Sequence, residues 1–166
     1  MNSGQPSAAD FERVLTVAIV DDDAQIRQAL GAWLAYHGMR AAYHGSGESL
    51  LQALAQKIGL KESGGGQAGQ LTLAAGGGCP VVCRLAGAVL DLNLPGMSGF
   101  ELGAALRLLD PGLPLVMITA LRDEEAVLHG SAPPGVRCLK KPFDLDVLEE
   151  LLLPQLREAM RLEKDL

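Results

Sequence analysis

The chain has 166 residues, enough for one domain with a substantial hydrophobic core. Its 14 basic and 20 acidic residues give a net charge of −6, which argues against direct binding of nucleic acid through bulk electrostatics. No apolar run approaches the roughly 20 residues that cross a bilayer, and Met1 to Asp10 is polar without the basic segment of a signal peptide. We expect a cytoplasmic protein without membrane insertion, with a disordered leader over residues 1–13.

Short apolar runs alternate with amphipathic segments, which predicts five strand–helix units. The expected strands are Val14–Val20, Met39–Tyr43, Ala86–Leu90, Leu115–Ile118 and Val136–Leu139. The expected helices are Ala24–His37, Glu48–Ile58, Ser98–Leu109, Asp123–His129 and one that begins near Leu145. Repeated units of this kind form a parallel sheet with helices on both faces. We therefore expect a doubly wound α/β fold of the flavodoxin-like type, with the strands in the order 2-1-3-4-5.

Two segments depart from this alternation of strands and helices. Eight of the twenty residues from Gly59 to Gly78 are glycine, which predicts a flexible surface loop inside an insertion over residues 59–84. Pro154 lies within the last expected helix and should kink or restart it, because proline lacks the N–H that the helix needs. The domain is therefore expected to span residues 14–153, with residues 154–166 as a tail or a helix extension. Leu109 and Val147 are expected to face inward.

Acidic residues follow two of the expected strands. Asp21, Asp22 and Asp23 come directly after the first strand, and Asp91 comes at the end of the third. In the simpler interpretation Asp23 caps the next helix and the other carboxylates are structural hydrogen-bond acceptors. However, parallel strands present their carboxyl ends at the edge where ligands bind, and clustered carboxylates repel one another. We therefore favour a site for a hard divalent cation such as Mg²⁺.

Two further polar residues are expected at the same edge. Thr119 follows the fourth strand and Lys141 follows the fifth. An aspartate can act as the nucleophile in phosphoryl transfer, and Mg²⁺ together with Lys141 would offset the charge of an anionic donor. Thr119 is placed to hydrogen-bond a phosphoryl oxygen. Because no Gly-x4-Gly-Lys-Ser/Thr loop is present, ATP is not expected to be the direct donor.

The three cysteines predict neither a zinc site nor a set of disulfides. Cys79 and Cys83 have C-x3-C spacing, but a zinc site would need two more ligands, and His129 and Cys138 lie at unsuitable spacing. An odd number of cysteines also argues against a set of disulfides. We favour ordinary thiols at these positions.

Four motifs, in this order, resemble the receiver domain of bacterial two-component response regulators. They are Val-Asp-Asp-Asp at 20–23, Leu-Asp-Leu-Asn-Leu-Pro-Gly-Met-Ser-Gly at 90–99, Ile-Thr-Ala at 118–120 and Lys-Lys-Pro-Phe-Asp at 140–144. The resemblance covers roughly residues 14 to 153, interrupted by the Gly-rich segment. It implies a signalling phosphoacceptor rather than an enzyme, in which Asp91 takes a phosphoryl group from the phosphohistidine of a histidine kinase or a histidine phosphotransfer protein.

The resemblance also implies a role for each site residue. Mg²⁺ would be bound by Asp22 directly, by Asp21 alongside, by Asp91, and by the backbone carbonyl of Asn93. Thr119 and Lys141 would contact the phosphoryl group. The family's lysine is Lys141 rather than Lys140, because Lys141 directly precedes Pro142, and that Lys–Pro bond is cis in the family.

Phosphorylation would then change the face formed by the helix at 123–129, the strand at 136–139 and the last helix, where the family meets a downstream protein or a second receiver. Two departures from the family bear on this switch. Cys138 stands where an aromatic residue is usual, so the switch is expected to rest on Thr119 and loop shifts alone. The insertion is about twenty residues longer than usual, but it is expected to lie far from the site.

Two other functions remain open on the sequence. A haloacid-dehalogenase-like phosphatase would use Asp21-Asp22-Asp23 and Thr119, but its later acidic pair is missing and it leaves Asp91 unexplained. A receiver-like module that binds a partner without being phosphorylated would need none of the phosphorylation residues, and all of them are present.

Overall fold

The computed structural model describes residues 15–55, 72–73, 83–120 and 135–164. Five strands form one parallel sheet in the order β2-β1-β4-β5-β6. They are β1 (Thr16–Val20), β2 (Arg40–His44), β4 (Cys83–Asp91), β5 (Leu115–Thr119) and β6 (Arg137–Lys140). The predicted order 2-1-3-4-5 is confirmed.

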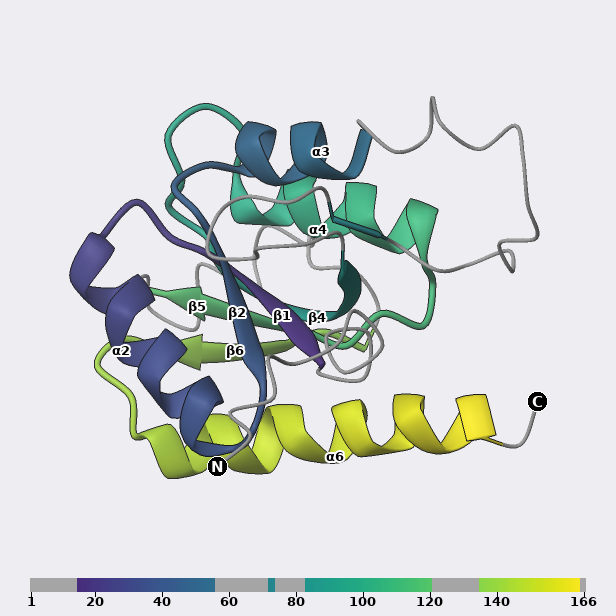
Figure 1. Ribbon diagram of the computed structural model, residues 1–166. Coiled ribbons are helices and arrows are strands. Elements are labelled where there is room, and N and C mark those ends of the chain that lie inside the picture. Colours follow the sequence, from purple (N-terminus) through teal and green to yellow (C-terminus); the bar gives the residue numbers. More distant parts are fainter. Residues whose placement is uncertain (1–14, 56–71, 74–82, 121–134, 165–166) are drawn as a thin grey trace, which may run out of the picture.

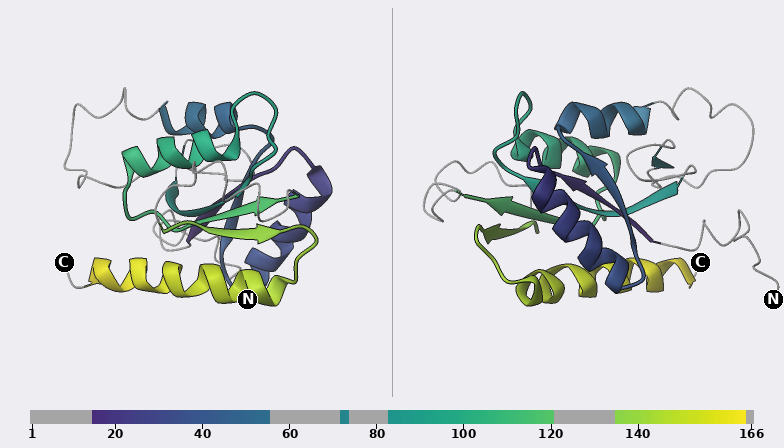
Figure 2. Two further views of the ribbon diagram at one scale, coloured as in Figure 1. Left: turned by 180° about the vertical axis from the view of Figure 1, so that it is seen from behind. Right: turned by 60° about the vertical axis from the view of Figure 1, so that its left-hand side comes forward.

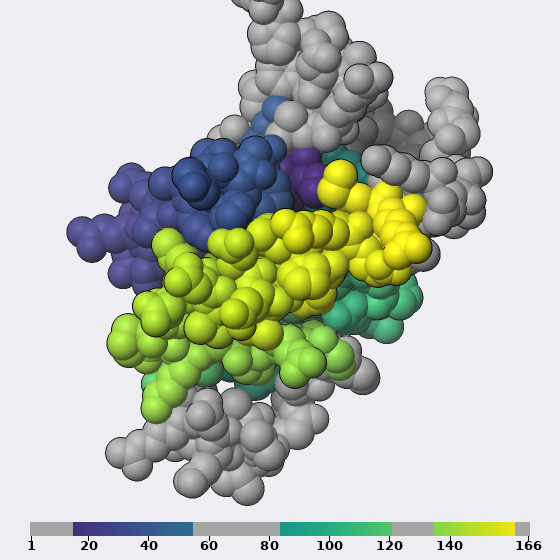
Figure 3. Space-filling model, turned by 90° about the horizontal axis from the view of Figure 1, so that it is seen from below, coloured from purple at the N-terminus to yellow at the C-terminus, as the bar shows by residue number. Residues whose placement is uncertain are grey.

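Helices cover both faces of this sheet, as Figure 1 and the two views of Figure 2 show. The helices α3 (Gly47–Ala55) and α4 (Gly99–Leu109) lie on one face. The helices α2 (Ala24–Tyr36) and α6 (Leu145–Lys164) lie on the other, where Figure 3 shows them side by side. The expected helix at 123–129 falls outside the described residues. None of the described helices has the length and apolar character needed to cross a bilayer.

The alternation of side chains along β1 explains why its sequence is apolar throughout. Ala18 and Val20 pack into the core on the side of α3 and α4, whereas Val17 and Ile19 pack on the side of α2 and α6. All four are fully buried. A central strand of a sheet covered on both faces has no solvent side, so it needs no polar alternation.

The insertion contains one element that the sequence did not predict. β3 (Thr72–Leu73) pairs antiparallel with the first residues of β4, with Thr72 opposite Arg84 and Leu73 opposite Cys83. The prediction of a loop throughout Gly59 to Gly78 is therefore wrong at these two residues. Because the start of β4 extends beyond β1, its backbone groups need another hydrogen-bonding partner, which β3 supplies. The neighbouring residues 56–71 and 74–82 fall outside the described part of the chain.

The last helix also differs from the prediction. α6 continues through Pro154 to Lys164 and does not restart (Figure 1). Pro154 is solvent-exposed, so water can satisfy the carbonyl group that loses its helical partner, while the buried leucines on the opposite side hold the helix to the sheet. Two residues expected to face inward are exposed, Leu109 by 41% and Val147 by 44%.

Candidate functional site

Three polar side chains are buried at the carboxyl edge of the sheet. Asp91 is the last residue of β4, Thr119 is the last residue of β5, and Asp21 directly follows β1. Only 4%, 1% and 2% of these residues is exposed, respectively. The backbone N–H of Asp21 donates to the His44 carbonyl at 3.1 Å, so the pairing of β1 with β2 continues up to the first carboxylate. The structure thus brings Asp21, Asp91 and Thr119 to the predicted edge.

Lys141 joins the two buried carboxylates. Its Nζ lies 3.0 Å from Asp21 Oδ2 and 3.0 Å from Asp91 Oδ2. Its backbone N–H donates to the Thr119 carbonyl at 2.7 Å, which fixes the chain just past β6 against β5. The Lys141–Pro142 bond is cis, as the family resemblance implies. The neighbouring Lys140 is exposed.

The charges in this cluster perturb one another. Burial raises the pKa of the Asp21 carboxyl, although hydrogen bonds from the Asp23 N–H and from Lys141 act in the opposite direction. Burial by itself would lower the pKa of Lys141. The hydrogen bonds and negative charges of Asp91 and Asp21 outweigh that effect, so the pKa of the ammonium group lies above its ordinary value. Two buried anions therefore share a single cationic side chain.

The second oxygen of each buried carboxylate is held by the backbone two residues further on. Asp21 Oδ1 accepts from the Asp23 N–H at 2.9 Å, and Asp91 Oδ1 accepts from the Asn93 N–H at 3.0 Å. Such turns fix the direction of each carboxylate. Asp23 itself caps α2, since its side chain accepts from the Gln25 N–H at 2.8 Å. The simpler interpretation of Asp23 as a helix cap is therefore correct.

The donor set at this edge fits a hard divalent cation. Asp21, Asp22 and the phosphoacceptor candidate Asp91 each offer a carboxylate oxygen, and these oxygens lie within 4.8 Å of one another. Mg²⁺ binds oxygen ligands at about 2.0–2.1 Å, so two opposite ligands stand roughly 4 Å apart and only a small adjustment is needed. Asp22 is exposed and keeps the cluster open to solvent. Such a cation would also supply the positive charge that one lysine does not provide.

The chain leaves this site through a closely packed turn into α4. A Cβ at residue 99 would lie 2.4 Å from the Asp91 carbonyl oxygen, so only glycine lets the helix start this near to the strand end. Ser98 caps α4, and Glu101 completes the capping box by accepting from the Ser98 N–H. The predicted capping box is confirmed. The start of α4 is thereby fixed beside Asp91.

Comparison with known proteins identifies this arrangement. Residues 86–153 match the family model of the response regulator receiver domain. Over this segment the chain is similar to response regulator receiver domains. A crystal structure of a response regulator receiver protein from Sinorhizobium medicae WSM419 has the same fold, with a TM-score of 0.61 at 20% identity, covering 89% of this chain and 98% of that one.

The curated relatives that the chain matches are longer proteins. The chain is 29% identical over 130 residues to the DNA-binding transcriptional regulator NtrC of Escherichia coli K12, covering 78% of this chain and 22% of NtrC. It is 28% identical over 147 residues to the probable transcriptional regulatory protein TcrX of Mycobacterium tuberculosis, covering 89% of this chain and 50% of TcrX. The chain thus spans between about a fifth and a half of these relatives.

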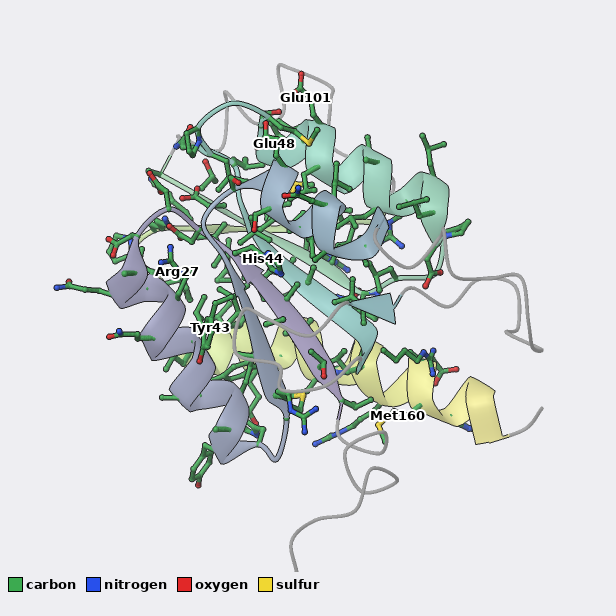
Figure 4. The ribbon with its side chains drawn as sticks, turned by 45° about the horizontal axis from the view of Figure 1, so that its top comes forward. Arg27, Tyr43, His44, Glu48, Glu101 and Met160 are labelled. Carbon is green, nitrogen blue, oxygen red and sulfur yellow. The ribbon has the colours of Figure 1, made fainter. Side chains whose placement is uncertain are left out.

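Sequence reasoning missed three residues near this site. Arg27 Nη1 donates to the Asp21 carbonyl at 2.5 Å, and Glu48 and His44 lie nearby at the start of α3 and the end of β2 (Figure 4). None belongs to a motif that the sequence revealed, and their contacts depend on how α2, β2 and α3 pack. Cys138 is exposed on β6. Cys79 and His129, the other residues weighed for zinc, lie outside the described part of the chain.

Proposed function

We propose that this receiver domain is a phosphoacceptor and that Asp91 takes the phosphoryl group. The observation that carries the proposal is the contact of its buried carboxylate with Lys141 Nζ at 3.0 Å, within reach of two further aspartates. A carboxylate that is buried, oriented by the Asn93 N–H and paired with a cation is prepared to receive an anionic group.

Mg²⁺ is the proposed cofactor, held by Asp21, Asp22, Asp91 and the backbone carbonyl of Asn93. When bound, it supplies charge neutralisation between the carboxylate and the phosphoryl oxygens. The fit of the three carboxylate oxygens and the burial of Asp21 support this assignment.

The proposed reaction is one phosphoryl transfer. An Asp91 carboxylate oxygen attacks the phosphorus of a phosphohistidine, an O–P bond forms, and the N–P bond breaks with its electron pair returning to the imidazole. Lys141, already 3.0 Å from Asp91 Oδ2, is placed to neutralise the incoming phosphoryl oxygens. The Thr119 hydroxyl would donate a hydrogen bond to one of these phosphoryl oxygens. The domain would assist its own phosphorylation and dephosphorylation without acting on another substrate.

The proposed partners follow from this chemistry. The proposed donor is a histidine kinase or histidine phosphotransfer protein, and we propose a cytoplasmic location. A downstream protein or second receiver would bind the face that includes β6, α6 and residues 123–129. The proposed receiver unit spans residues 14–153, with residues 59–84 as an insertion and residues 154–166 as an extension. We propose neither direct binding of nucleic acid nor membrane insertion for this unit.

The test is intact-mass measurement after incubation with acetyl phosphate, with and without Mg²⁺, for the full chain and for Asp91→Asn. We expect one added phosphoryl group that needs Mg²⁺ and is absent from the variant. An adduct mapped to Asp21 instead would indicate the chemistry of a dehalogenase-like phosphatase. No adduct, with Mg²⁺ binding still measurable, would overturn the proposal in favour of a binding module.

A further inference from the structure

A side chain from outside the site holds the loop that follows Asp91. Residues 92–98 connect β4 to α4, and the N–H of Met97 in this loop donates to Glu48 Oε1 at 2.7 Å. Glu48 belongs to the first turn of α3 and is 49 residues away in the sequence. The contact therefore joins two separate elements at the edge of the sheet that carries the site.

Packing around this hydrogen bond is close on both sides. Gly96 has a φ of +77°, and a Cβ there would lie 2.6 Å from Glu48 Oε1. A Cβ at residue 47 would lie 3.3 Å from Met97 Sδ. The two glycines thus let α3 and the loop approach until the carboxylate meets a backbone N–H. At Gly96 the positive φ itself favours glycine, so the loop can bring its backbone close to the Glu48 carboxylate.

The first turn of α3 is itself fixed to the sheet. His44, the last residue of β2, is buried, and its Nδ1 lies 2.9 Å from Ser49 Oγ. The Ser49 N–H donates to Ser46 Oγ at 3.2 Å, which satisfies a free donor at the start of the helix. Glu48 lies between these anchored residues. It therefore projects from a fixed turn, not from a mobile one.

The loop that Glu48 holds carries the site. The Asn93 N–H orients Asp91, and the Asn93 carbonyl is the proposed backbone ligand of Mg²⁺. The two ends of the loop are fixed by the contact of Gly99 N with the Leu92 carbonyl and by the capping box at Ser98. Glu48 adds a further contact at Met97, near the α4 end of the loop. Figure 4 labels Glu48 and Glu101, which belong to the first turns of α3 and α4.

We propose that Glu48 is a positioning residue of the receiver site, which holds the loop 92–98 in the arrangement that binds the cation. This inference rests on the proposed function. The carboxylate touches neither the cation site nor the phosphoryl position, and acts through the backbone of Met97. Since Glu48 is solvent-exposed, its hydrogen bond adds little to global stability, and its loss should be felt at the site rather than in the fold.

The experiment compares Glu48→Ala and Glu48→Gln with the unchanged full chain. Calorimetric titration with Mg²⁺ gives the dissociation constant, and thermal unfolding without Mg²⁺ gives the stability. Glu158→Ala is the matched control, because Glu158 is also exposed but belongs to the far half of α6. A glutamine retains the acceptor oxygen while losing the charge, so it separates the hydrogen bond from the electrostatic effect of one carboxylate.

We expect Glu48→Ala to weaken Mg²⁺ binding by about three- to tenfold, the effect of one hydrogen bond, with a thermal midpoint close to that of Glu158→Ala. Glu48→Gln should retain binding within about twofold. Unchanged binding in Glu48→Ala, or an equal loss in both Glu48 variants, would overturn the inference. If the unchanged chain binds Mg²⁺ but accepts no phosphoryl group from acetyl phosphate, the proposed function fails separately.

Discussion

Two buried carboxylates and one ammonium group define the chemistry of this site at the scale of single residues. Asp21 and Asp91 each approach Lys141 Nζ to 3.0 Å, and both are almost fully shielded from water. Removing one partner from a buried ion pair leaves an uncompensated charge, which is costlier than removing the whole pair. Lys141 therefore has a structural role in the absence of Mg²⁺ as well as its proposed role in phosphoryl transfer.

We predict that Lys141→Ala lowers the free energy of unfolding by about 2 kcal/mol without Mg²⁺, less than the value for a fully buried pair because Lys141 is partly exposed. Saturating Mg²⁺ should recover part of this loss, because the cation replaces the missing charge. Urea denaturation with and without Mg²⁺ measures both. Lys140→Ala, which removes the exposed neighbouring charge, should change the stability by less than about 0.5 kcal/mol. Equal effects of the two substitutions would contradict the structural role of Lys141 as the partner of the two buried carboxylates.

His44 gives the fold a dependence on pH. Burial lowers the pKa of its imidazole below the ordinary value of 6.5, so the unfolded chain binds the proton first as the pH falls. The stability that neutral His44 provides is therefore complete above that ordinary value and is lost progressively below it. We predict that the unchanged protein loses more stability than His44→Asn between about pH 7 and pH 5. Denaturation at both pH values tests this, and parallel losses in the two proteins would contradict it.

At the scale of elements, the hydrophobic pattern predicted which segments form strands and helices but not where each one stops facing the core. Leu109 ends α4 and Val147 lies in the first turn of α6, and both are exposed although their spacing fits the buried face. Periodicity describes a direction around a helix and contains no information about where the sheet beneath it ends. The capping box at Ser98 was predictable because its residues are local in sequence.

The approach of α4 to β4 gives a prediction for that pair of elements. Gly99→Ala places a Cβ 2.4 Å from the Asp91 carbonyl oxygen, so the helix start must move away from the strand end. We expect a loss of about 1–3 kcal/mol in the free energy of unfolding and slower phosphorylation by acetyl phosphate.

The control for Gly99 lies just beyond the other end of the same helix. A Cβ at Gly112 would make only an ordinary contact, 3.6 Å from Asp110 Oδ1, so Gly112→Ala should leave both quantities nearly unchanged. If Gly99→Ala were tolerated equally well, the close approach of α4 would not be needed to place Asp91.

At the scale of the whole molecule, the strand order decides which residues meet. Once β1 lies beside β4, the carboxylates of Asp21 and Asp91 converge, and this much followed from the order of the motifs. The contact of Glu48 with the Met97 N–H could not be predicted, because it depends on how α3 is seated on the sheet and no local pattern records it. The pairing of β3 with β4 could not be predicted either, because a two-residue strand is too short to show a periodic pattern.

Core packing continues beyond residue 153, where the family match ends. Leu156, beyond Pro154, is 2% exposed, and its Cδ2 lies so near β4 that a Cβ at Gly87 would be only 3.0 Å from it. The second half of α6 thus contributes to the core on the side of α2. Met160, one turn further on, is 37% exposed.

We therefore predict that Leu156→Ala lowers the free energy of unfolding by about 2–4 kcal/mol, the cost of a cavity at a buried leucine. Met160→Ala, at a residue more than a third exposed, should cost less than about 1 kcal/mol. Urea denaturation of both variants, with one transition expected in each, measures the difference. Equal and small losses would mean that α6 beyond Pro154 is an appendage and that the folded unit ends near residue 153. A large loss at Leu156 alone would show that the sheet needs this second half of α6 to complete its core.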